Sequence, residues 1–393
     1  MFSDRVPADL VPNRLTQAIA ERRREGREFV DLTESNPTRV GFDYPADLLA
    51  PLADARGLEY RPEPFGAVPA RAAIADDYRR RGVAVAADRV VLTTSTSEAY
   101  SLLFKLLANA GDDVLVPRPS YPLLDHLARL DIVNVHPYEL EYHGRWSIDL
   151  DSVSRALTTS TRAVLIVSPN NPTGSFVSRE DLDRLARICG ERGVAIVADE
   201  VFADYELEPG AASRAGRVAV RDDVLGFTLG GLSKSVGLPQ VKLGWIVVSG
   251  LEPIVGDALR RLELVCDTYL SVSTPVQLAA ADWLGRGAAI RVQIIERVRA
   301  NHRELLRQAV SAPSCRVLCS EGGWYAVLQV PSYQSEETLV LSLLANDDVL
   351  THPGYFYDFP RESFLVVSLL PPVQTFRDGI ARVLRHFTCT DRS

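Results

Sequence analysis

The stretch of sequence that decides the fold, residues 224–245, reads VLGFTLGGLSKSVGLPQVKLGW. An apolar run of strand length ends at Leu229 and passes into a glycine-rich loop that contains Lys234 and Lys242. Only three of the 43 basic residues are lysines, Lys105 being the third, and the other 40 are arginines. This excess of arginine indicates a coding bias, and because the two side chains differ chemically, a remaining lysine is a candidate for a position that needs the amine itself. Lys105 falls in a helical pattern and fits an ordinary surface residue. A lysine in such a loop as that of Lys234 and Lys242 is most often a surface residue or a phosphate contact.

Short apolar runs alternate with longer helical patterns on both sides of this stretch, from about residue 70 to 285. We expect strands at 90–93, 114–116, 163–167, 194–198, 224–229 and 245–248, and helices at 70–81, 97–107 and 179–192. This alternation predicts an α/β fold with a mostly parallel sheet flanked by helices. A long helical pattern over residues 288–310 leads into residues 315–393, which are expected to form a smaller C-terminal α+β domain. We therefore expect three parts, 1–44, 45–285 and 286–393.

Polar residues follow the expected strands at their carboxyl ends, where open parallel sheets bind ligands. After the strand at 90–93, Ser95 and Glu98 fit a capping box, which indicates nothing more than a well-capped helix. The same helix start, with Ser95, Thr96 and Ser97, also suits a phosphate group, because its backbone N–H groups are unpaired. Both interpretations stay open at this point.

Two further strand ends carry weak signals. The strand at 163–167 leads into Asn170-Asn171-Pro172-Thr173-Gly174, which is common turn chemistry. The strand at 194–198 leads into Asp199-Glu200, which suits a metal site or a solvated loop, but no His or Cys accompanies the pair. Together, a phosphate site, an Asn-Pro-Thr-Gly turn, an Asp and a Lys at successive strand ends are what pyridoxal phosphate requires.

Composition excludes several other classes of protein. Of the 393 residues, 46% are hydrophobic and 24% are charged, so the chain is expected to fold rather than to be disordered. The net charge of −8 argues against a nucleic-acid partner. No apolar run is long enough for a membrane span, and the first residues contain no signal-peptide pattern. Five scattered cysteines indicate neither a disulfide framework nor a metal cluster. We expect a cytoplasmic protein.

The combined motifs resemble those of the fold-type I, class I/II aminotransferases that depend on pyridoxal phosphate. The resemblance covers nearly the whole chain. It rests on residues 60–66 with Ala70-Arg71, residues 94–99, residues 111–117 with 119–122, and residues 170–174, 199–202 and 233–239. Any one of these stretches matches by chance often enough, but all of them in this order leave little room for another cofactor family.

The resemblance implies a role for each matching residue. Lys234 would carry the cofactor as a Schiff base and move the substrate's proton. Asp199 would pair with the pyridine nitrogen, and Asn171 would donate to the phenolic oxygen. The remaining contacts would come from Ser95, Thr96, Ser97 and Lys242 at the phosphate, Tyr121 on the ring face, Tyr60 at the phosphate of the neighbouring subunit, and Asn36 with Arg39 in a segment that covers the substrate. A homodimer with shared active sites follows from the position of Tyr60.

The chain departs from the family pattern at four positions. Phe202 stands where a Tyr usually donates to the phenolic oxygen, and Gly231 stands where a Ser often binds the phosphate. Lys242 replaces an Arg, which removes a bidentate fork but keeps the charge. The fourth departure concerns the substrate, because Val366 aligns with the Arg that usually grips the α-carboxylate. We expect Arg39, Arg361 or Arg377 to replace it, with Arg39 preferred, unless the substrate lacks that carboxylate.

The expected function is the transfer of an amino group between an amino acid and a 2-oxo acid. Two alternatives remain at the level of sequence. One is another reaction of the same cofactor, such as that of a β-lyase, a decarboxylase or an oxidase. The other is a regulatory or binding protein that keeps the fold without catalysis, which the presence of Lys234, Asp199 and Asn171 argues against. The amino donor, the acceptor and the pathway are not determined.

Overall fold

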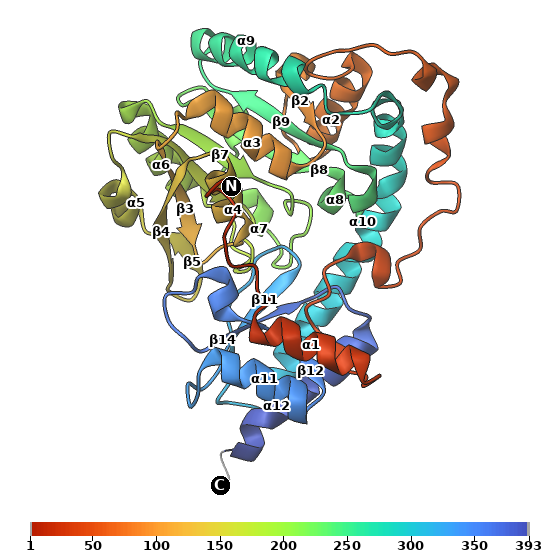
Figure 1. Cartoon of the computed structure of the whole chain (residues 1–393), viewed down its shortest axis with the longest axis vertical. Coiled ribbons are helices and arrows are strands. Elements are labelled where there is room, and N and C mark those ends of the chain that lie inside the picture. The colour runs from red at the N-terminus through yellow and green to blue at the C-terminus, as the bar shows by residue number, and fades with distance from the viewer. Residues whose placement is uncertain (1, 391–393) are drawn as a thin grey trace.

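A computed structural model describes residues 2–390, without the side chains of the last two, and its larger sheet has eight strands (Figure 1). In spatial order these are β2 (Val90–Thr93), β9 (Gly244–Ser249), β8 (Gly226–Gly231), β7 (Ala195–Asp199), β6 (Thr161–Val167), β3 (Asp113–Arg118), β4 (Asn134–Tyr142) and β5 (Trp146–Ile148). Strands β9 and β5 run antiparallel to their neighbours, and the others are parallel to one another. The carboxyl ends of β2, β8, β7, β6 and β3 therefore meet at one edge of the sheet.

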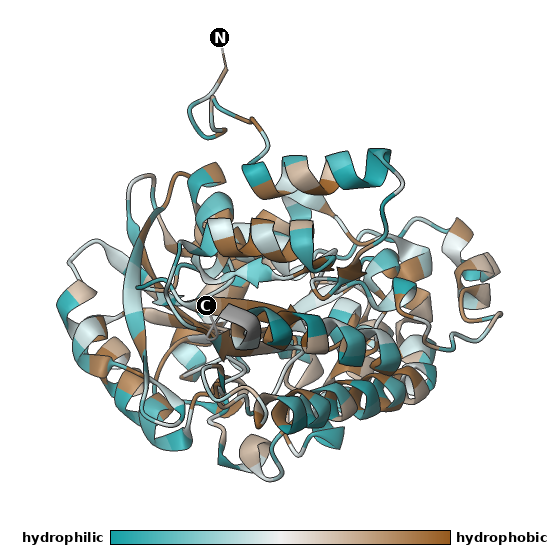
Figure 2. Cartoon of the chain, turned by 90° about the horizontal axis from the view of Figure 1, so that it is seen from below, coloured by the Kyte–Doolittle hydropathy of each residue, from teal (hydrophilic) through white to brown (hydrophobic). Residues whose placement is uncertain are grey.

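Helices cover both faces of this sheet, which explains why its central strands are continuous apolar runs. In β6, Ala163 and Leu165 pack toward one face and Val164 and Ile166 toward the other. The first face is covered by α3 (Thr96–Leu107), α4 (Leu123–Leu130) and α9 (Glu252–Tyr269). The second is covered by α5 (Leu150–Ala156) and α6 (Arg179–Arg192), and the short α7 (Ala211–Arg214) lies further along the chain. In Figure 2 the inner strands are mainly brown, while the outer helices alternate between teal and brown.

A smaller antiparallel sheet forms the second part of the molecule. Its order is β10 (Arg316–Val317), β11 (Tyr325–Gln329), β14 (Phe364–Ser368) and β13 (His352–Pro353), and it is accompanied by α11 (Glu336–Asn346) and α12 (Val373–Thr390). The N-terminal segment joins this part, since α1 (Arg14–Arg24) contacts α11 and β1 (Val30–Asp31) pairs in parallel with β12 (Val349–Leu350). The segment from α1 to β1 and the C-terminal part of the chain thus build one region.

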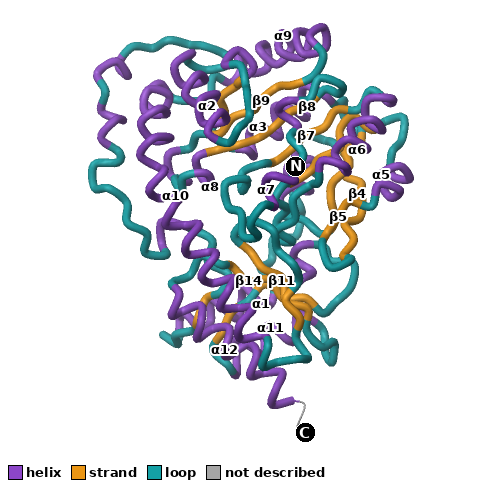
Figure 3. Tube along the Cα trace, turned by 180° about the vertical axis from the view of Figure 1, so that it is seen from behind, coloured by secondary structure: helices purple, strands orange, loops and turns teal. Residues whose placement is uncertain are grey.

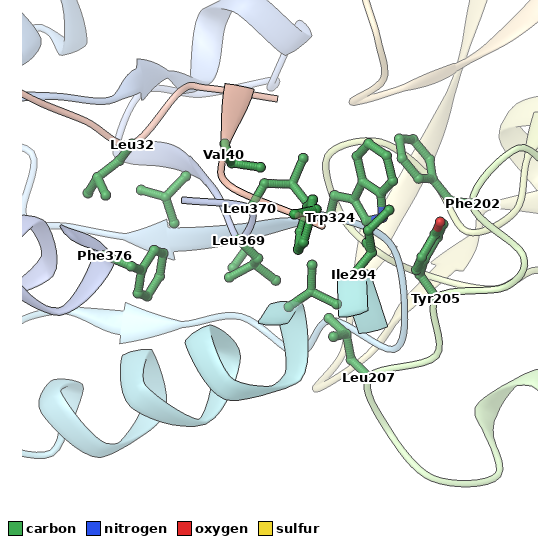
Figure 4. Packing of buried hydrophobic residues seen from close by; sticks show 14 of the residues in the cluster. Leu32, Val40, Phe202, Tyr205, Leu207, Ile294, Trp324, Leu369, Leu370 and Phe376 are labelled. Carbon is green, nitrogen blue, oxygen red and sulfur yellow. The ribbon is translucent and has the colours of Figure 1, made fainter. Parts of the chain in front are cut away.

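Helix α10 (Thr274–Ala309) connects the two sheets (Figures 1 and 3). It packs against α2 (Val68–Arg80) beside the large sheet and against α12 beside the small one. Figure 4 shows the buried cluster at this junction, where Leu32 and Val40 of the N-terminal segment meet Ile294 of α10 and Trp324 and Leu369 of the C-terminal part. The apolar core is therefore continuous between the two sheets.

The predicted fold class is confirmed, but several elements differ from the expected ones, and the strands β4 and β5 were not expected. The strand expected at 245–248 belongs to β9 and runs antiparallel. The helix expected from residue 288 begins at Thr274, and α9 was not expected at all. The division into 1–44, 45–285 and 286–393 stays a prediction, and α10 crosses its second boundary without a break. No helix within residues 2–390 is both long and apolar enough to span a bilayer.

Candidate active site

A cavity of about 340 Å³ lies at the carboxyl ends of β2, β6, β7 and β8. Its position agrees with the expectation that ligands bind at this edge of a parallel sheet. Eight of the predicted site residues line it, namely Ser95, Thr96, Ser97, Tyr121, Asn171, Asp199, Lys234 and Lys242. The fold therefore brings together side chains that are spread over nearly 150 residues of sequence.

Lys234 lies in the one-turn helix α8 (Leu232–Ser235), directly after β8. Its backbone is fixed from outside the loop, because the Tyr205 hydroxyl donates to the Lys234 carbonyl and Arg291 Nε donates to the Ser235 carbonyl at 2.9 Å. The ammonium nitrogen lies 5.5 Å from the centre of the Trp324 ring. Burial lowers the pKa of Lys234, and the nearby Asp199 carboxylate opposes that shift. The side chain is thus an amine that releases its proton more readily than a lysine in water.

Asp199 ends β7 and is partly buried in the wall of the same cavity as Lys234. Its Oδ2 accepts from the Tyr100 hydroxyl at 3.2 Å, and its Oδ1 accepts from the Val201 amide at 3.1 Å. Burial raises the pKa of Asp199 to about 6, although both hydrogen bonds and Lys234 favour the charged form. A carboxylate held in this way is suited to a cationic partner that the cavity would receive.

Asn171 is buried in the turn between β6 and α6, and its Oδ1 has no hydrogen-bond partner among the described residues. The turn itself is well paired, since the neighbouring Asn170 donates to the Pro119 carbonyl at 3.1 Å and to Thr173 Oγ1 at 2.9 Å. A buried polar atom without a partner costs about 1–3 kcal/mol, so such atoms commonly serve a ligand. Asn171 thus has unused hydrogen-bonding capacity at the cavity.

The N-terminus of α3 forms another wall. Ser95 is the N-cap, and its Oγ accepts from the Glu98 amide at 3.1 Å. The Glu98 carboxylate returns to the Thr94 amide at 2.6 Å, one residue earlier than a capping box requires. The helix cap and the expected phosphate site therefore coincide, because the first residues of α3 also line the cavity.

Three predicted residues do not line this cavity in a single chain. Tyr60 is 76% exposed and lines a different hollow, together with Ser273 and Thr274. Asn36 caps a short 3-10 helix, with its Oδ1 accepting from the Thr38 amide at 3.0 Å, and Arg39 is exposed at the end of that helix. The predicted substrate contacts of Asn36 and Arg39 are therefore not supported by their positions.

The other two arginines considered for the substrate carboxylate, Arg361 and Arg377, also lie outside the cavity. Arg361 is exposed, with its guanidinium 5.7 Å from the Phe364 ring centre. Arg377 lies on α12 and donates to Glu304 at 3.2 Å. Val366 is buried within β14 between Val327 and His352 on the neighbouring strands, in an apolar cluster. No arginine lines the cavity in the described part of the chain.

The structure adds residues that the sequence motifs did not single out. Tyr100 holds Asp199, and it lies one helical turn after Ser97 on the face of α3 that carries the apolar residues. Ser35 and Tyr325 complete the cavity wall from the N-terminal segment and from β11. Among the described residues, no group of three or more His, Cys, Asp or Glu side chains is arranged to hold a metal ion.

Comparison with known proteins identifies the family. The sequence model described as aminotransferase class I and II matches residues 42–375. The chain belongs to this family. It is 27% identical to the glutamate-pyruvate aminotransferase AlaA of Haemophilus influenzae over 92% of this chain and 91% of that protein. It is also 27% identical to the tyrosine aminotransferase of Bos taurus, over 84% of this chain and 75% of that protein.

A solved aminotransferase from Escherichia coli has a similar structure, with a TM-score of 0.85 and 25% identity, over 99% of this chain and 98% of that one. The chain described here therefore shares the fold-type I architecture of that aminotransferase across nearly its whole length. Membership of the family implies use of pyridoxal phosphate, and the cavity at the strand ends is where the matching motifs meet.

Proposed function

We propose that this aminotransferase transfers an amino group between an amino acid and a 2-oxo acid, with pyridoxal phosphate bound in the cavity at the strand ends. One observation carries the proposal, which is the juxtaposition of a partly buried lysine of lowered pKa with a partly buried carboxylate in the same cavity. A neutral amine serves as a nucleophile and as a base, and a buried carboxylate stabilises a cation placed against it.

The residues fit the four polar groups of the cofactor. Lys234 offers the amine for its aldehyde, and Asp199 the negative charge for its pyridine nitrogen. The buried side chain of Asn171 would donate from its Nδ2 to the phenolic oxygen. The first turn of α3 with Ser95, Thr96 and Ser97, together with the charge of Lys242, suits its phosphate. When bound, the cofactor supplies an electron sink for the pair of electrons left on the substrate's Cα.

The chain's own residues would handle the proton. Lys234 would take the proton from the substrate's Cα and hold it on its Nζ, and its lowered pKa keeps the amine available as a base. Asp199 would place a negative charge against the ring nitrogen, and Tyr100 holds the carboxylate in place by its hydrogen bond. Phe202 lies in the cavity wall with its ring 5.3 Å from Trp324, so it contributes packing and no hydrogen bond.

We extend the proposal to the partners of the protein. The first donors to test are alanine, glutamate and tyrosine, because the named relatives act on glutamate and pyruvate or on tyrosine. A homodimer in which Tyr60 of one protomer reaches the site of the other would explain why Tyr60 is exposed in a single chain. A cytoplasmic location belongs to the same proposal.

A half-reaction tests the proposal. Purified protein loaded with cofactor is mixed with each donor in turn, without an acceptor, and its absorbance is followed. Transamination should convert the bound cofactor into pyridoxamine phosphate and release one 2-oxo acid for each site. Release of ammonia with an unchanged cofactor would instead establish a lyase, and no reaction with any donor would favour a protein without this activity.

A further inference from the structure

Several hydroxyl-bearing side chains line the cavity, and three of them come from segments outside the Lys234 loop and outside α3 with its N-cap. These three are Ser35 from the N-terminal segment, Tyr121 from the loop after β3 and Tyr325 from β11, and they are called the hydroxyl wall below. Ser35 and Tyr325 are neighbours in the cavity wall, and the Ser35 hydroxyl lowers the pKa of Tyr325. Tyr121 is 46% exposed, so the wall is open to an incoming molecule. Three segments that are far apart in sequence thus present neutral hydrogen-bonding groups to one space.

The positive charges of the cavity lie elsewhere. Among the described lining residues the cations are Lys234 and Lys242, and both belong to the loop that follows β8. Their charges are engaged by the proposed contacts with the cofactor. Arg39, Arg361 and Arg377 lie outside the cavity, as described above. A substrate's acid group at the hydroxyl wall would therefore meet no guanidinium from its own chain.

The strands β14 and β13 beside β11 provide no positive charge at the hydroxyl wall. Val366 is 1% exposed and lies opposite His352 in the register of β13 and β14. His352 is itself committed, with Nδ1 3.0 Å from the Tyr357 hydroxyl, and burial lowers the pKa of His352 to about 4. The imidazole is consequently neutral near pH 7.

A carboxylate acts on the pKa of Tyr325, and its charge has the wrong sign for binding an anion. Burial raises the pKa of Tyr325 to about 12, and Tyr121 and the Glu34 carboxylate add to the shift. The neighbouring Ser35 hydroxyl opposes it. The Tyr325 hydroxyl therefore stays protonated and able to donate. Glu34 is held in place by the Asn36 amide at 2.8 Å from its Oε1, so an acid remains close to the wall.

We infer that the hydroxyl wall holds the group on the substrate's Cα through neutral hydrogen bonds, and that this aminotransferase accepts α-amino carboxamides nearly as well as α-amino acids. The inference rests on the proposed function and names its substrate class. A guanidinium fork distinguishes a carboxylate from its neutral amide strongly, because only the anion gains the charge-assisted pair. Hydroxyl groups donate to the oxygen of either one.

Paired donors test this inference. The half-reaction is measured with L-alanine against L-alaninamide and with L-tyrosine against L-tyrosinamide, each rate being corrected for the fraction of unprotonated amine. Each donor gives its amino group to the cofactor and gains the oxygen of one water molecule, so the products are a 2-oxo acid or a 2-oxo amide. We expect kcat/KM for acid and amide to agree within about tenfold. A preference of about 100-fold or more for the acid would overturn the inference and require a cation from the partner subunit.

Variants assign the effect to the wall. Tyr325→Phe removes one hydroxyl and should raise KM for acid and amide by the same factor, about tenfold, while the absorbance of the bound cofactor stays unchanged. Tyr333→Phe is the matched control, because Tyr333 is 70% exposed and lies outside the cavity, and it should change neither KM. An effect of Tyr325→Phe on the acid alone would contradict the inference.

A binding measurement separates this inference from the proposed function. Propanoate and propanamide, which carry no amino group, are titrated calorimetrically into the cofactor-loaded protein. Dissociation constants within about tenfold of each other support the neutral wall even if no donor reacts. Binding of propanoate about 100-fold tighter than propanamide would overturn it, whatever the outcome of the half-reaction.

Discussion

Asp199 shows how the chain maintains a site that is unfavourable for its own stability. The carboxyl group is buried at the end of β7, and its pKa rises from 3.8 to about 6 in the cofactor-free protein. Two hydrogen bonds, from Tyr100 and Val201, fix its position but do not compensate for the lost hydration. A cation bound against the carboxylate would offset this lost hydration. Asp199 is therefore preorganised for a cationic partner, and the cofactor-free protein is less stable as a result.

A pH series on the cofactor-free protein tests this description. Since the folded pKa of Asp199 lies above the unfolded value, its contribution to stability is complete at about pH 3 and lost as the pH rises through about 6. Asp199→Asn removes this loss, so near pH 7 the variant should be more stable than the wild type by up to about 3 kcal/mol. Urea unfolding at several pH values measures the difference. The same variant should lose several powers of ten in its half-reaction, and equal stability of the two proteins at pH 7 would contradict the buried charge.

Residues of the site divide into those that sequence could predict and those that it could not. Lys234, Asp199 and Asn171 each follow an apolar strand directly, so topology alone places them at one edge. Ser35 and Tyr325 reach the same cavity through the packing of the small sheet against the large one, which no local pattern encodes. The position of Arg39 was equally undetermined, because the direction of a side chain in a short 3-10 helix depends on its tertiary contacts.

Helix α10 illustrates the same limit at the scale of elements. Gly285 and Gly287 lie within it, and such residues weaken a helical pattern in sequence, so the helix was expected to begin only at residue 288. The structure explains one of the two glycines. A Cβ at Gly287 would lie 2.5 Å from the Cβ of Val236, two residues after Lys234, so the glycine permits α10 to approach the lysine loop. A Cβ at Gly285 would contact nothing within 4 Å.

These two glycines provide a matched pair of variants. Gly287→Ala should destabilise the protein by about 1–3 kcal/mol and weaken cofactor retention, because it displaces the Lys234 loop. Gly285→Ala lies at an exposed helical position and should stabilise the protein by about 0.5–1 kcal/mol. Thermal unfolding and cofactor titration measure both effects. Similar behaviour of the two variants would mean that α10 does not press against the loop.

The N-terminus of α3 provides a second pair. Ser95→Asp keeps a good N-cap, so the cofactor-free protein should unfold within about 0.5 kcal/mol of the wild type. The new charge beside the phosphate should nevertheless weaken cofactor binding by about 100-fold or more. Ser95→Ala should do the reverse, costing about 1 kcal/mol of stability for the lost cap with a smaller effect on the cofactor. If Ser95→Asp bound the cofactor normally, the phosphate would have to lie elsewhere.

At the scale of the whole molecule, exposed aromatic and aliphatic side chains mark a surface that a single chain leaves uncovered. Leu58 is 91% exposed and Tyr60 76% exposed, in a segment that the family motifs connect with the cofactor. The fold class and the position of the site could be predicted from the alternation of strands and helices. The antiparallel direction of β9 could not, because a strand's direction is set by its connections and not by its own residues.

Mixed dimers test whether two chains share a site. Tyr60→Phe and Lys234→Ala proteins should each be impaired, since one loses a phosphate contact and the other loses the amine. In a hybrid dimer one site would carry both changes and the other would be intact, so about half of the wild-type turnover should return per hybrid. Activity is measured after unfolding and refolding the two together, with hybrid formation checked by native mass spectrometry. Confirmed hybrids that do no better than the parent proteins would exclude a shared site.

Covalent trapping tests the role of Lys234 most directly. The purified protein is loaded with pyridoxal phosphate, reduced with borohydride and digested, and the labelled peptide is sequenced by mass spectrometry. We expect one label per chain on Lys234, and none in a Lys234→Ala protein that still folds. A label on Lys105 or Lys242, or a wild-type protein that binds the cofactor without any label, would contradict the assignment of Lys234 as the amine that carries the cofactor.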